Sequence, residues 1–175
     1  MTMTTILFDV VRDFSIAFVV AFCWGILFGS PRKILLVAGL MGGLGHSIRF
    51  ILLQLDFGLI SATLAGSVAI GLIGIFVAHK VHNPPVVFTM PACITMIPGV
   101  FAYKTMLAGI KMTDLSVATN NPTILIQMTH NLMLTMSLLF TLAIGICIGA
   151  LLFRKTSVRD ISLAKTLEKM SNLRK

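Results

Sequence analysis

Charged residues are scarce in this sequence, and acidic residues are the scarcer kind. Only 11% of the 175 residues are charged, with six Asp and Glu against fourteen Lys and Arg. Soluble domains contain about 25% charged residues, so this deficit excludes an ordinary soluble domain. The chain is instead 57% hydrophobic with a mean hydropathy of +0.97, which indicates an integral membrane protein. We predict one all-α, polytopic transmembrane domain over residues 1–153, with no enzyme-sized domain outside the membrane.

Cysteine is also sparse. The three cysteines, Cys23, Cys93 and Cys147, lie in apolar segments without metal-ligand spacing, which argues against a disulfide framework or a zinc site. We therefore expect no metal and no cofactor. The N-terminus lacks the basic region and cleavage site of a signal peptide, so we expect the first helix to be retained. Because no nucleophile–base pair or zinc motif shares a helix face, we predict that the protein is not an enzyme.

Basic residues are concentrated near the C-terminal end, where seven of the fourteen Lys and Arg follow Leu152. Positive residues collect on the cytoplasmic side of membrane proteins. This pattern predicts a cytoplasmic C-terminus and an external N-terminus, with Arg32, Lys33 and Lys80 in inward-facing loops. Because membrane topology explains the basic residues, we expect no nucleic-acid partner. Apolar residues at helical spacing within 154–175 predict a basic amphipathic tail helix on the inner membrane surface or against a partner.

Five apolar segments are long enough to cross a hydrocarbon core of about 30 Å as helices. We expect spans at residues 6–29, 34–53, 59–78, 86–106 and 123–153. Interior prolines remove a backbone hydrogen bond, so we expect the fourth span to be broken at Pro98-Gly99. If this span is instead a re-entrant pair of half-helices, the N-terminus would lie inside.

Small residues at helical spacing are typical of faces on which membrane helices pack closely. They form GxxxG pairs in the second and last spans and a stripe on the third: Gly39 and Gly43, Gly145 and Gly149, and Ser67, Gly71, Gly74 and Ala78. We expect close helix contacts at these faces.

A basic pair lies within the second span. His46 and Arg49 are three residues apart and therefore share one helix face. A cation inside a span costs at least about 2.5 kcal/mol, so such residues normally face a bundle interior or a watery cavity. Imidazole and guanidinium donors suit a carboxylate, and the guanidinium can bind it in bidentate geometry. The pair predicts a basic site inside the membrane domain.

Other polar or irregular positions share the depth of this pair on the predicted topology, which indicates a common cavity. The substrate-binding candidates are His46, Arg49, Pro98, Gly99, Tyr103 and Asn131. The proton-coupling candidates are Asp13, His46 and His130, whose pKa values respond to burial and to nearby charge.

Each candidate also has a purely structural interpretation. Arg49 could extend to the headgroups, His46 could be a packed histidine bonded to a carbonyl, and Asp13 could cap its helix. The other positions could supply interhelical hydrogen bonds or a simple kink.

Three motifs carry a family resemblance: SPRK after the first span, GHSIR on the second and IPGVFAY at the break. Together they resemble the threonine/serine exporter family, in the C-terminal half that also occurs as a small, YjjB-like subunit. The resemblance extends to about residue 153. It implies a bacterial inner-membrane exporter that works with a larger, YjjP-like membrane subunit, and a substrate that is threonine, serine or succinate.

Several functions fit these residues. We favour a subunit of a secondary exporter of small carboxylates, with the lipid bilayer and the larger subunit as partners and a possible oligomer of the complex. A homo-oligomeric channel would use the same polar layer as a selectivity ring. An assembly or regulatory subunit would use it to dock a partner. If the chain is one half of an inverted-repeat transporter, we expect its partner to have five spans in the opposite orientation.

Overall fold

The computed structural model describes residues 3–81, 83–114 and 121–152, which form helices joined by turns and short loops. Six helices lie in this part of the chain: α1 (Met3–Leu27), α2 (Arg32–Gln54), α3 (Leu59–Val81), α4 (Val86–Ile94), α5 (Gly99–Met112) and α7 (Pro122–Leu152). The all-α prediction is confirmed for these residues. The predicted tail helix at 154–175 lies outside them.

Three helices, α2, α3 and α7, are long and apolar enough to cross a membrane. The helices α4 and α5 form a further span if they are taken together, and they are bent by 60° at the break between them. A bent pair of this kind is either a broken span or a re-entrant loop. The expected first span corresponds to α1, whose crossing stays a prediction.

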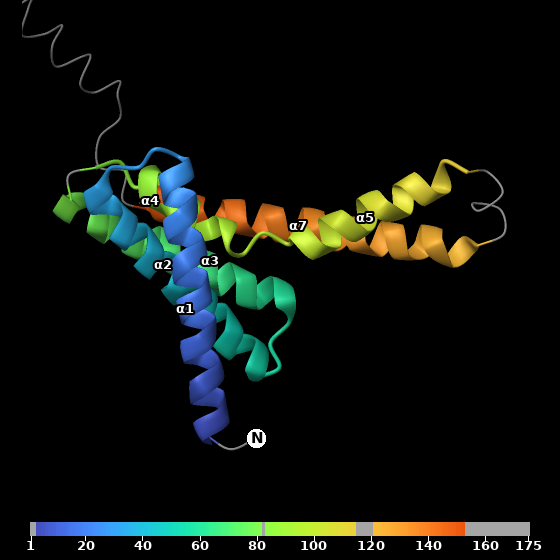
Figure 1. Cartoon of the computed structure of the whole chain (residues 1–175), viewed down its shortest axis with the longest axis horizontal. Coiled ribbons are helices and arrows are strands. Elements are labelled where there is room, and N and C mark those ends of the chain that lie inside the picture. The colour runs from blue at the N-terminus through green and yellow to red at the C-terminus, as the bar shows by residue number, and fades with distance from the viewer. Residues whose placement is uncertain (1–2, 82, 115–120, 153–175) are drawn as a thin grey trace, which may run out of the picture.

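The helices form a body and an arm (Figure 1). Helices α1–α4 pack against one another, and the second half of α7 lies against α3. The arm consists of α5 and the first half of α7, which pack together and extend away from the body (Figure 1). No residue of α5 is buried in the isolated chain. The core therefore lies between α2, α3 and α4, around Phe88, Ile70 and Met96.

The contact between α1 and α2 is built on the predicted GxxxG pair. A Cβ atom on Gly39 would come within 2.8 Å of the Phe18 ring, and one on Gly43 within 2.7 Å of the Phe14 ring. These two rings stack 6.5 Å apart along α1. Aromatic side chains thus fill the space that the glycines leave, and they fix how α1 lies on the site-bearing face of α2.

The contact between α3 and α7 brings backbone against backbone. A Cβ atom on Gly71 would lie 2.7 Å from the Gly145 carbonyl oxygen, and one on Gly145 would overlap the Ser67 side chain. Gly149 contacts the Gly71 backbone in the same way. Ser67 and Gly71 of the predicted stripe therefore meet the glycine face of α7, which anchors α7 to the body, whereas Gly74 faces Thr89 of α4.

Candidate functional site

The centre of the candidate site is a pair of ionisable side chains between α1 and α2. Nδ1 of His46 lies 2.7 Å from Oδ2 of Asp13. The side chains are 27% and 20% exposed, so the pair is largely withdrawn from the surface. When Asp13 is ionised, the hydrogen bond requires the proton on Nδ1, because a carboxylate is only an acceptor. In the neutral ring the second nitrogen, Nε2, is then a hydrogen-bond acceptor.

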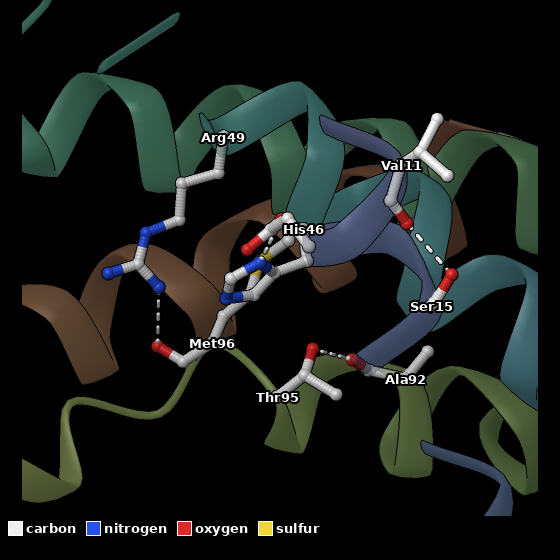
Figure 2. A network of polar contacts seen from close by, with 8 residues as sticks. Val11, Ser15, His46, Arg49, Ala92, Thr95 and Met96 are labelled. Atoms are coloured by element: carbon white, nitrogen blue, oxygen red, sulfur yellow. Dashed lines mark hydrogen bonds and ion pairs between the residues drawn. The ribbon is translucent and has the colours of Figure 1, made fainter. Parts of the chain in front are cut away.

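Arg49 connects α2 to the break between α4 and α5. Its guanidinium donates a hydrogen bond of 3.1 Å to the backbone carbonyl of Met96 (Figure 2). Met96 itself is fully buried, whereas Arg49 is partly exposed. The arginine therefore bonds a main-chain carbonyl within the fold and does not use all its donors there, since a guanidinium carries five N–H groups.

The chain breaks at this place for a local reason. Pro98 has no N–H to donate and precedes α5 with a ψ of 60°, which is not helical. Short turns satisfy the neighbouring amides, as Met96 N–H donates to Cys93 and Gly99 N–H donates to Ile97. Thr95 donates its hydroxyl to the Ala92 carbonyl (Figure 2). Arg49 donates to the Met96 carbonyl, so the charge of the guanidinium lies next to the break.

A small pocket adjoins the Asp13–His46 pair, between the N-terminal half of α1 and the C-terminal end of α2. Its volume is about 350 Å³, and its lining includes Asp9, Arg12, Asp13 and Gln54. Side chains of both charges and an amide therefore surround one opening beside His46. Within the described ranges, no three His, Cys, Asp or Glu side chains lie close enough to share a metal ion.

The remaining predicted residues lie elsewhere. Tyr103 is 64% exposed on α5. His130 and Asn131 lie on α7 and line a second pocket of about 650 Å³ with Lys104 and Lys111 from α5. The structure therefore brings Asp13, His46, Arg49 and the break together, and it places the arm residues in a separate pocket. The sequence suggested one cavity because these residues share a predicted depth in the membrane. Depth does not determine how far apart residues lie in the membrane plane.

Some features of these sites were not predicted. The Met96 carbonyl carries no side-chain signal, and only its position two residues before a membrane proline points to it. Lys104 and Lys111 are seven residues apart on one helix face, a spacing that could have revealed the arm pocket. Ser47, between His46 and Arg49, has a buried hydroxyl without a hydrogen-bond partner. The turn of α2 that carries His46 and Arg49 thus contains a buried hydroxyl group that is available for a further hydrogen bond.

Comparison with known proteins adds the family. Residues 13–152, more than half of the chain, match a family model described as threonine/serine exporter, ThrE. An uncharacterized protein of Haemophilus influenzae is 28% identical over 150 residues, which cover 86% of this chain and 50% of that protein. The chain thus spans about half the length of this relative. No solved structure matches.

Proposed function

We propose, on the premise that this chain belongs to the threonine/serine exporter family, that it is one subunit of a secondary exporter of small carboxylates in the bacterial inner membrane. The substrate is an amino acid such as threonine or serine, or a dicarboxylate such as succinate. A larger membrane subunit supplies the rest of the transport path.

The observation that carries the proposal is the position of Arg49. Its guanidinium is held at a break in a bent helix pair by the Met96 carbonyl. Discontinuous helices form the substrate sites of many secondary transporters, because the break leaves main-chain groups available within the membrane. A carboxylate bound there would take the guanidinium N–H groups that Met96 does not use, in the bidentate geometry that arginine favours.

The Asp13–His46 pair supplies the proton-coupling part of the proposal. The two side chains approach each other to 2.7 Å, and His46 lies one helical turn before Arg49 on α2. Binding an anion near His46 favours the protonated ring, and its departure favours proton release. A proton can therefore move with, or against, the carboxylate.

The arm supports the proposed partner. None of the residues of α5 is buried in the isolated chain. An incomplete bundle of this kind is expected when a second set of helices completes the path, as in transporters built from two repeats.

The test is efflux of preloaded labelled succinate and threonine from cells that co-express the chain with its larger subunit. Arg49→Ala is compared with wild type, with Arg32→Ala and with each subunit alone, all at equal membrane levels. We expect Arg49→Ala to abolish efflux, Arg32→Ala, which changes an exposed arginine at the start of α2, to retain most of it, and both subunits to be needed.

The outcomes separate the alternatives. Normal export by Arg49→Ala would contradict a carboxylate site at the break. Efflux that never saturates and ignores the proton gradient would indicate a channel instead. Export by the larger subunit alone would assign this chain an assembly or regulatory role.

A further inference from the structure

The arm pocket between α5 and α7 is strongly basic and is not used by the proposed site. Lys104 and Lys111 line it from α5, and Gln127, His130 and Asn131 line it from α7. Its volume is about 650 Å³. Lysine, imidazole and amide groups are all hydrogen-bond donors, so the pocket suits an anionic group with several acceptor oxygens. The nearest acidic residue in the sequence, Asp114, follows α5 and is not part of the lining.

The depth of the pocket along α7 points to the membrane interface. From Leu132 to Leu152 the helix carries no charged residue and no histidine, over about 20 residues. At 1.5 Å per residue this stretch alone covers a hydrocarbon core of about 30 Å. His130 and Asn131 precede it directly, so they lie where the hydrocarbon ends and the headgroups begin.

The depth along α5 agrees with this placement. The apolar sequence of the bent pair ends at Ala102 and is followed by Tyr103 and Lys104. Tyrosine and lysine are typical of the membrane–water boundary. Two helices thus independently place the pocket at headgroup level. The predicted topology puts these lysines on the outer side, where the positive-inside bias does not account for them.

The lining of the pocket also has an apolar part. Leu107, Ala108, Ile124 and Ile126 complete the lining. Ile126 is 68% exposed and Leu107 is 37% exposed, so these side chains present a hydrocarbon surface beside the cationic groups. A ligand that is anionic at one end and apolar at the other fits both parts, whereas a small soluble carboxylate fits only the first.

We infer that this pocket binds the phosphate headgroup of an anionic phospholipid, whose acyl chains lie along the exposed apolar side chains of the arm. Lys104 and Lys111 bind the phosphate, and the amides of Gln127 and Asn131 donate to its remaining oxygens. Bound lipid would occupy space between the two helices of the arm and hold α5 against α7.

The experiment uses the purified full-length chain in mild detergent. It is mixed with equal amounts of phosphatidylglycerol and phosphatidylcholine that carry the same acyl chains, and retained lipid is counted by native mass spectrometry. Each lysine near a membrane surface is worth roughly a fivefold factor for an anionic lipid, so we expect a wild-type preference for phosphatidylglycerol on the order of 25-fold.

Matched variants locate the effect. We expect Lys104→Gln/Lys111→Gln to lose the preference and Lys104→Arg/Lys111→Arg to keep it. The control Lys33→Gln/Lys80→Gln removes the same amount of charge from the start of α2 and the end of α3. It should also keep the preference. Inorganic phosphate and succinate, each in molar excess, distinguish a lipid site from a site for soluble anions, because neither should displace the lipid.

Equal retention of both lipids by wild type would overturn the inference, as would displacement by phosphate or succinate. Loss of the preference in the Lys33/Lys80 control would attribute it to overall charge and overturn it too. If the glutamine variant loses its helical circular dichroism, the wild-type ratio and the two displacement measurements still decide. Lipid retention is read without transport, so this result is independent of the exporter proposal.

Discussion

Arg49 connects two elements, because its backbone belongs to α2 and its guanidinium bonds the break after α4. Lysine at this position would keep the charge but lose the planar, bidentate donor set. We predict that Arg49→Lys lowers efflux by roughly tenfold to a hundredfold, the range expected when a hydrogen bond to a charged group is lost.

The measurement is initial efflux rate against internal substrate concentration. Lys33→Arg, which exchanges the same two residue types near the start of α2, serves as the control and should leave efflux unchanged. Equal rates for Arg49→Lys and wild type would show that charge alone suffices.

A second prediction concerns the Asp13–His46 pair. Asparagine at position 13 can still bond the ring but carries no charge, so it cannot balance the charge of a protonated His46. We predict that Asp13→Asn changes how efflux varies with pH between about pH 5 and 8, the usual range for histidine. Wild type should vary across it.

Asp9→Asn is the matched control, since Asp9 is one turn earlier on α1 and lines the same small pocket. It should retain the wild-type pH profile. A Asp13→Asn variant that keeps that profile would remove the pair from proton coupling.

The environment of a residue was predictable where exposing its side chain to lipid would cost free energy. A histidine and an arginine in an apolar span must find partners, and the sequence identified both side chains. Their partners were harder to predict. Asp13 is 33 residues from His46, and the Met96 carbonyl is 47 residues from Arg49. Such pairings depend on how helices are arranged laterally, which hydrophobic periodicity does not specify.

At the scale of elements, the crossing of α3 and α7 depends on Gly145. A methyl group there would overlap the Ser67 side chain and approach the Val68 amide at 2.9 Å. We predict that Gly145→Ala destabilises the protein by about 1–3 kcal/mol, the usual cost of overpacking, and lowers its melting temperature in detergent.

Two further variants test the cause. Ser67→Gly combined with Gly145→Ala should recover part of the loss, because it removes the overlapping side chain. Gly109→Ala is the control, since nothing lies within 4 Å of the position where its Cβ would be built. An unchanged melting temperature in Gly145→Ala would contradict the close crossing.

The elements themselves followed closely from the sequence. Spans expected at 34–53, 59–78 and 123–153 correspond to α2 (Arg32–Gln54), α3 (Leu59–Val81) and α7 (Pro122–Leu152). Long apolar runs bounded by Pro, Gly and charged residues leave few other ways to satisfy the backbone in lipid. The break at Pro98 was also predictable, because proline lacks the N–H that would continue the helix, although Pro91 lies inside α4. Its angle of 60° was not, since that depends on packing.

At the scale of the whole molecule, the orientation in the membrane is open to direct test. We predict an external N-terminus, which places the turn at Gly58 outside and the turn at Ser30 inside. In a variant with all three cysteines changed to serine, Gly58→Cys should react with a membrane-impermeant maleimide on intact cells and Ser30→Cys should not.

Permeabilised cells provide the control, because both cysteines should then react. The reverse pattern on intact cells would place the N-terminus inside, as a re-entrant α4–α5 pair requires.

The arm was the part of the molecule that the sequence did not predict. From the sequence we expected His130 and Asn131 to share one cavity with the Asp13–His46 pair, but they line a different pocket. The α5 helix packs on α7 and buries none of its residues, so nothing in its periodicity specifies a position against the body. A second chain or bound lipid can supply that missing information.

The backbone contact between α3 and α7 also has a consequence for biosynthesis. The two helices are separated by about 40 residues of chain. At synthesis rates of about 5–20 residues per second, α7 emerges roughly 2–8 s after α3. During that interval the groove of small residues on α3 has no helix of its own chain to fill it. Insertion of this protein therefore includes a waiting period, and a ribosome that stalls before residue 122 would leave a membrane helix with its packing face uncovered.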